Sequence, residues 1–368
     1  MKQIGQTMHE TRLESDDVKD TVRRHMPVVG RGGSLNAWNR IEADELQGAN
    51  SNGATLMPQP AVARPPNTTL PTLKKTFATL QIGRGKMPYW RNRPIDTYDP
   101  LVTRAIIVIH GFRGNAEGYF HRINNIIPST WKDKALVIAP HFQKKSQAGN
   151  GEWWWDGDWR EGGASGGASS YAVVDAMVAR LRNGTFPNLM WVVIAGHSAG
   201  GQFTQRYAAF TDINLQSAPL SPLVKFVPAN PSSYVYLNEY RIRSDNSWVV
   251  PRRNGSGESY NQFKFGLDDL YDYAADRGAD WARSHLPACR VELLAGTEDV
   301  VVDKGFDDSC PAMWQGRTRY ERAQNFNAFM RRFYPANQFS MTPVPGVGHD
   351  STEMFESPQG MRALFFAD

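Results

Sequence analysis

Unbroken apolar runs alternate with amphipathic stretches along the chain from residue 76 onward. The apolar runs are typical of strands buried on both faces and span 104–112, 135–142, 191–194, 223–233, 289–296 and 339–346. Helical spacing marks 169–183, 202–210 and 319–334, a further helix is expected to start near Asn115, and a short helix closes the chain. The stretches 76–83 and 87–92 predict a β-hairpin. This order predicts an α/β fold with a mostly parallel central sheet flanked by helices.

The first 72 residues differ from the rest. They begin with charged, apolar-poor sequence and continue through GANSNGATLMPQPAVARPPNTTLP, which has no periodicity. This composition predicts an irregular N-terminal arm or linker, with short helices at about 16–25 and 35–46. One large domain, 73–368, is expected to follow, with a cap-like insertion at about 236–285 that is rich in aromatic residues.

Composition excludes several classes of protein. The chain has 368 residues, of which 41% are hydrophobic, enough for one large core. A formal net charge of +4, with no basic run interleaved with aromatic residues, argues against nucleic-acid binding. No apolar stretch approaches the ~20 residues that cross a bilayer, and the first residues lack the apolar core of a signal peptide. We therefore expect no membrane span, and composition predicts no oligomeric state.

One serine is surrounded by small residues where a strand meets a helix. The turn Gly196-His197-Ser198-Ala199-Gly200 fits G-x-S-x-G, the nucleophile elbow in which small neighbours relieve crowding around a strained serine. Such a turn places the hydroxyl at a helix N-terminus, where N–H groups favour an oxyanion. The pattern alone is equally consistent with an ordinary turn, so its context decides.

That context consists of polar residues that follow three other predicted strands. His110-Gly111-Phe112 ends one strand, Asp299 follows another in GTED, and His349 follows a third in PGVGHD. Ligands bind at the carboxyl ends of parallel strands, where these residues are expected to meet. The order serine, aspartate, histidine is that of a known hydrolytic triad.

The chain resembles the α/β-hydrolase superfamily from about residue 76 to its end. The motifs that carry this resemblance are HGF, GHSAGG, GTED and PGVGHD. The segments FPNL, ANPSSY and SCPAMWQG, at 186, 229 and 309, are most similar to a poorly characterised bacterial and fungal group, a resemblance that implies no substrate. The family resemblance implies a serine hydrolase, and neither a metal nor an organic cofactor.

The resemblance and the chemistry together assign three roles. Ser198 is the nucleophile, His349 the general base and then acid, and Asp299 the carboxylate that orients the imidazole. Other residues could fill these roles: Glu298, Asp303 or Asp350 for the acid, and His141 or His197 for the base. His110 is expected to hold its loop by hydrogen bonds rather than to react. The oxyanion donors are expected to be the N–H groups of Ala199 and Phe112, with Arg113 as the alternative to Phe112.

Candidates for a substrate pocket are Arg113, after the strand that ends at Phe112, and the tryptophans after the strand that ends near residue 142: Trp153, Trp154, Trp155 and Trp159. Consecutive tryptophans in an extended segment point to opposite faces, so the three at 153–155 cannot all enter one core. Covering the core and stacking on a substrate are equally consistent with this pattern. Arg160, Arg241 and Arg243 could bind an anionic group, although a solvated surface is the default.

The two cysteines, Cys289 and Cys310, bracket the strand and loop that carry Asp299. A disulfide between them would restrain this loop and would favour an exported protein, whereas two separate thiols would leave the compartment open.

The sequence thus predicts a serine esterase that cleaves a small-molecule or polymeric carboxylic ester through an acyl-enzyme. Two alternatives remain. An amidase, peptidase or acyltransferase would use the same triad, and a non-catalytic binding protein on a hydrolase scaffold would need neither Ser198 nor His349.

Overall fold

The computed structural model describes residues 76–214, 222–251, 260–303 and 305–366. The predicted N-terminal arm, 1–72, with its two short helices, lies outside these residues. The division of the chain at residues 72 and 73 therefore stays a prediction.

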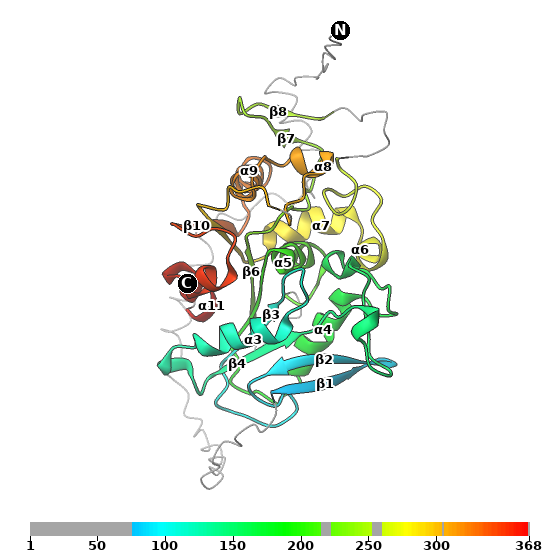
Figure 1. Ribbon diagram of the computed structural model, residues 1–368, viewed down its shortest axis with the longest axis vertical. Helices are drawn as coiled ribbons and strands as arrows, with labels where there is room; N and C mark the ends of the chain where they lie inside the picture. Colours follow the sequence, from blue (N-terminus) through cyan, green and yellow to red (C-terminus); the bar gives the residue numbers. More distant parts are fainter. Residues whose placement is uncertain (1–75, 215–221, 252–259, 304, 367–368) are drawn as a thin grey trace, which may run out of the picture. The chain divides into compact units, whose positions relative to one another are not determined.

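Among the described residues, eight strands form one sheet in the order β1-β2-β4-β3-β5-β6-β9-β10. The β1–β2 hairpin lies at one edge and β10 at the other (Figure 1). β1 and β2 are antiparallel, β2 is antiparallel to β4, and the later strands run parallel. The strands are β1 Phe77–Ile82, β2 Gly85–Arg91, β3 Arg104–Ile109, β4 Ala135–Pro140, β5 Trp191–His197, β6 Leu223–Ala229, β9 Val291–Gly296 and β10 Phe339–Val344. The hairpin and the mostly parallel sheet confirm the predicted fold class.

Helices cover both faces of this sheet. Side chains of α3 (Ala116–Asn125), α10 (Ser351–Glu356) and α11 (Pro358–Phe365) form one core cluster with residues of the central strands. On the other face, α9 (Arg319–Phe333) packs Phe326 against Phe339, which alternation points away from that cluster. The remaining longer helices are α4 (Ser170–Leu181) and α5 (Ala199–Phe210). Together they bury the central strands on both faces, as their unbroken apolar sequences predict.

The segment between β6 and β9 contains short elements in its described part. They are β7 Arg241–Ile242, β8 Trp248–Val249, α6 Asp272–Arg277 and α7 Ala279–His285, and the small helix α8, Cys310–Met313, follows β9. Arg241 does not lie on a solvated surface. It is buried, with its guanidinium 4.1 Å from the ring centre of Tyr236.

The predicted disulfide is wrong, because both cysteines are free. Cys289 is buried just before β9, with Sγ 3.3 Å from the Ala208 carbonyl O, and burial raises the pKa of this thiol to about 12. Cys310 is exposed and begins α8, after the loop beyond the far end of β9. A six-residue strand spans ~20 Å, whereas bridged Cα atoms lie within about 7 Å. The argument for export falls with the disulfide, and the location remains open.

Two of the candidate tryptophans are buried inside the protein. Trp155 is buried and its Nε1–H donates to the Gly163 and Ala168 carbonyls. Trp159 is buried and stacks on Phe142, with ring centres 5.5 Å apart. Substrate contact by Arg113, Trp153 and Trp154 stays a prediction.

Candidate active site

Ser198 lies in a strained turn between β5 and α5. Its backbone has φ 60° and ψ −118°, a conformation that residues other than glycine rarely adopt. The neighbouring glycines provide room for this turn. A Cβ at Gly196 would lie 2.4 Å from the Gly200 carbonyl O, and one at Gly200 would lie 2.2 Å from the Ile109 carbonyl O. The start of α5 therefore packs directly against the backbone at the end of β3.

The three residues singled out by sequence meet at the carboxyl ends of their strands. His349 Nε2 lies 2.9 Å from Ser198 Oγ, and His349 Nδ1 lies 2.7 Å from Asp299 Oδ2. An ionised carboxylate can only accept, so Nδ1–H donates to Asp299 and Nε2 is free to accept from the serine hydroxyl. Asp299 is almost fully buried, whereas the His349 side chain is partly exposed. This arrangement can pass a proton from a serine to an imidazole.

Arg319, which sequence reasoning missed, holds Asp299 from the other side. Its Nη1 lies 3.3 Å from Asp299 Oδ1, and both side chains are only 1% exposed. Its Nε donates to Ser232 Oγ at 3.0 Å, and its Nη2 pairs with Asp303. The backbone N–H of Tyr320 donates to the Asp299 carbonyl O. The first turn of α9 thus fixes both the backbone and the carboxylate of Asp299.

Asn230, also missed, fixes the loop that carries His349. The predicted strand 223–233 ends at Ala229, because Asn230 has a φ of 42° and turns the chain out of the sheet. Its side-chain amide donates to the Gly348 carbonyl O at 2.9 Å and accepts from Gly296 N–H at 2.8 Å. One side chain therefore ties the ends of β6 and β9 to the residue before His349.

The alternative acids have other contacts. Asp350 accepts from Thr352 and Glu353 N–H groups as the N-cap of α10, and Asp303 pairs with Arg319. Glu298 lies 3.5 Å from Thr297 Oγ1. Within the described part of the chain, Asp299 is the carboxylate that hydrogen-bonds His349.

Of the alternative histidines, His197 is buried and His141 is partly buried. Burial lowers the pKa of His141, and it lowers that of His197 well below its usual range, with the nearby His349 as the next cause. His110 Nε2 accepts from Phe142 N–H at 3.0 Å, so Nδ1 carries the proton and donates to the Gly111 carbonyl O at 2.8 Å. These bonds join the ends of β3 and β4, the structural role predicted for His110.

Burial lowers the pKa of His110 to about 4, and we expect this to appear as acid sensitivity. The unfolded chain binds a proton at this imidazole below about pH 6.5, whereas the folded protein binds it only near pH 4. The free energy of unfolding should therefore fall as the pH drops below about 6.5, by roughly 2 kcal/mol from this residue at pH 5. Urea unfolding at pH 7 and pH 5 measures the loss. The loss of stability should be smaller in His110→Asn but should persist in the control His121→Asn, because the side chain of His121 is half-exposed to solvent. An equal loss in both variants would contradict the assignment.

The loop expected to supply an oxyanion donor begins beside the turn that carries Ser198. β3 pairs with β5, so the loop after β3 that contains Phe112 and Arg113 lies next to the serine turn. As the first residue of α5, Ala199 has an N–H without an acceptor in its own helix. The choice between Phe112 and Arg113 stays open.

Two further observations concern the described residues alone. No helix among them combines the length and the apolar character needed to cross a membrane. No group of three or more His, Cys, Asp or Glu side chains in these ranges could hold a metal ion.

Comparisons with known proteins identify similar solved structures. No family model matches the chain, and no curated protein matches it. The LpqC poly(3-hydroxybutyrate) depolymerase from Bordetella parapertussis is 23% identical with a TM-score of 0.51, over 77% of this chain and 89% of that one. Poly(aspartic acid) hydrolase-1 from Sphingomonas sp. KT-1 is 20% identical with a TM-score of 0.50, over 77% and 96% respectively. At these identities the likeness establishes a common fold.

Proposed function

Because this chain has the α/β-hydrolase fold, we propose that it is a serine hydrolase that cleaves a carboxylic ester through an acyl-enzyme. The observation that carries the proposal is the continuous hydrogen-bonded chain from Ser198 Oγ through His349 to Asp299. A serine hydroxyl is a weak nucleophile at neutral pH and needs an adjacent base.

In the first step, Ser198 Oγ attacks the ester carbonyl carbon while its proton passes to His349 Nε2. Asp299 stabilises the imidazolium through the Nδ1–H bond, and Arg319 keeps the carboxylate in place. When the tetrahedral intermediate collapses, the C–O bond to the alcohol breaks and the imidazolium protonates the leaving oxygen. Water then attacks the acyl-enzyme by the same route, which releases the acid and restores Ser198.

We propose that the N–H groups of Ala199 and Phe112 bind the developing oxyanion, with Arg113 as the alternative to Phe112. Donors fixed before the reaction need no reorganisation when negative charge appears, and loss of one such donor typically costs about 2.7–4 kcal/mol of transition-state stabilisation. The packing of Gly200 against the end of β3 supports this pairing, because it keeps the two loops close.

A panel of 4-nitrophenyl esters, the matching anilides and insoluble ester polymers tests the proposal. We expect ester hydrolysis and stoichiometric labelling of Ser198 by a fluorophosphonate, located by peptide mass spectrometry. Faster turnover of anilides would favour an amidase. No turnover of any substrate and no label on Ser198 would favour a binding protein and refute the proposal.

A further inference from the structure

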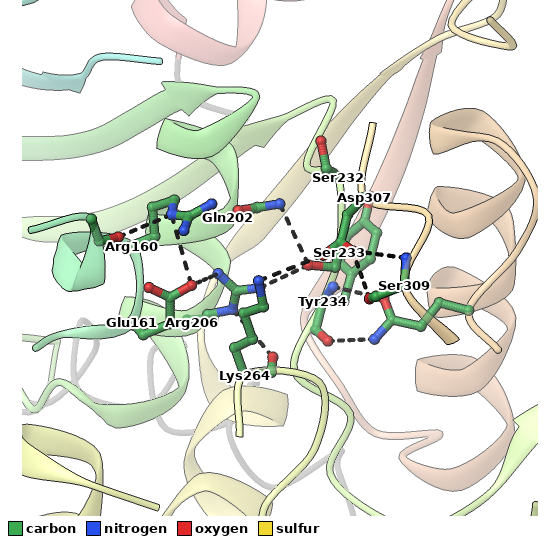
Figure 2. Close-up of polar contacts among 12 residues, drawn as sticks. Arg160, Glu161, Gln202, Arg206, Ser232, Ser233, Tyr234, Lys264, Asp307 and Ser309 are labelled. Atoms are coloured by element: carbon green, nitrogen blue, oxygen red, sulfur yellow. Dashed lines mark hydrogen bonds and ion pairs between the residues drawn. The ribbon is translucent and has the colours of Figure 1, made fainter. Parts of the chain in front are cut away.

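A hollow of about 510 Å³ lies between three segments: residues 157–161, residues 262–271 and residues 307–311, which lead into α8. Charged side chains from all three segments line it, among them Arg160, Glu161, Lys264 and Asp307, which are drawn with their polar contacts in Figure 2. Phe263, Phe265 and Tyr271 add aromatic walls. A hollow of this size accommodates a substantial part of a small molecule.

Arg160 connects the hollow to the loop after β3. The Arg160 guanidinium lies 5.8 Å from the ring centre of Phe112, in the loop assigned to the oxyanion. Glu161, which lines the hollow, pairs with Arg206 of α5 (Figure 2). Gln202 and Arg206 of the same helix both contact Ser233. Arg206 lies eight residues after Ser198, ~12 Å along the helix axis. This length gives the scale of the separation between Ser198 and the Arg206–Glu161 pair behind the hollow.

The carboxylates that line the hollow are engaged by protein groups. Both oxygens of Asp158 accept from Ser165, and Asp307 accepts from the N–H and hydroxyl of Ser309. Glu161 pairs with the fully buried Arg206 at 3.3 Å. Glu161 is thus paired with a cation from outside the hollow, whereas Asp158 and Asp307 accept from serine hydroxyl and amide groups.

The hydrogen-bond donors that line the hollow have fewer acceptors within the protein. Arg160 uses Nε, which donates to the Gly157 carbonyl O and lies 3.8 Å from Glu161, while its two terminal nitrogens contact no acceptor among the described residues. Lys264 lies 3.5 Å from Asp307 through one ammonium group that carries three protons. Burial raises the pKa of Tyr271, so its hydroxyl remains a donor. Burial lowers the pKa of Lys264, with the neighbouring Arg206 as the next cause, and a bound anion would offset both effects.

We propose that this hollow binds a carboxylate of the substrate, held by Arg160 and Lys264, and thereby selects esters that carry a free acid group several bonds from the scissile carbonyl. A carboxylate is an acceptor-only group that matches a guanidinium bidentately. The inference rests on the proposed function and names the class of its substrate.

Paired substrates test this selection. One pair is the 4-nitrophenyl hemiesters of five- to eight-carbon dicarboxylic acids and their methyl-capped forms, and the other is the butyrate ester of 4-hydroxybenzoate and its methyl ester. We expect kcat/KM to favour the free acid at least tenfold in one pair, which also shows whether the acyl or the alcohol side enters. Arg160→Gln and Lys264→Gln should each reduce that ratio about tenfold, mainly through KM. The control Arg331→Gln, at an exposed arginine of α9, should keep it.

A variant that gains a new substrate preference distinguishes a lost binding site from a misfolded protein. Arg160→Glu should shift the preference toward esters that carry an ω-amino group, which a damaged protein cannot do. Equal turnover of acid and capped substrates by the unaltered protein in both pairs, or preference for the amino ester, would overturn the proposal. Binding is also measured without turnover, since glutarate to suberate should raise the Tm of the unaltered protein but not of Arg160→Gln. Absence of this shift refutes the carboxylate site, whereas absence of all ester turnover with the shift present refutes the proposed reaction alone.

Discussion

Ser198→Ala is expected to lower kcat for ester hydrolysis by about 10⁴-fold or more, while the protein stays folded. The hydroxyl contacts His349 at the carboxyl edge of the sheet, so its removal deletes the nucleophile but little packing. Steady-state kinetics with a 4-nitrophenyl ester, together with thermal unfolding, measures both effects.

Ser284→Ala is the matched control, because this exposed serine of α7 hydrogen-bonds only carbonyl groups of its own helix. It should retain full activity and labelling by the fluorophosphonate. If Ser198→Ala retained activity near that of the unaltered protein, another residue would have to be the nucleophile.

Asp299→Asn is expected to lower kcat by about 10³- to 10⁴-fold. An amide at this position can keep an oxygen toward Arg319, but its NH₂ toward His349 Nδ1 would favour the tautomer whose Nε2 carries a proton and cannot accept one. Since breaking a buried ion pair can cost about 3–5 kcal/mol of stability, the Tm must be measured beside the kinetics.

The rival carboxylates provide the comparison for this variant. Glu298→Gln and Asp350→Asn should change kcat less than tenfold, because neither side chain contacts the imidazole in the structure. Asp303→Asn should have an intermediate effect at most, since it acts through Arg319. A loss in one of these three variants that exceeded the loss in Asp299→Asn would reassign the acid.

The sheet and the three residues at its edge could be predicted from sequence because their signals are local. Unbroken β-branched runs identify buried strands, and parallel strands bring their carboxyl ends to one edge whatever lies between them. For the same reason Ser198, Asp299 and His349 could be expected to meet although 50 or more residues separate consecutive members.

The supporting residues depend on distances that no local pattern contains. Arg319 begins a helix and resembles a solvated cation, yet Arg319, Arg322 and Phe326 share the helical spacing of one buried face. That spacing was the available signal for a buried arginine. The disulfide prediction failed because it relied on the closeness of the two cysteines in the sequence. The extended strand β9 lies between them and holds them apart. The charged hollow draws on three separated segments, and only the assembled fold shows them together.

The strained turn at Ser198 lowers the stability of the fold while it presents the hydroxyl that the proposed reaction needs. A non-glycine residue at φ 60° and ψ −118° costs of the order of 1–3 kcal/mol, and glycine would adopt that conformation freely. The amino acid that best suits the backbone is therefore one that cannot react. A library selected for heat resistance alone would tend to discard the hydroxyl, so any effort to harden this fold must select for turnover at the same time.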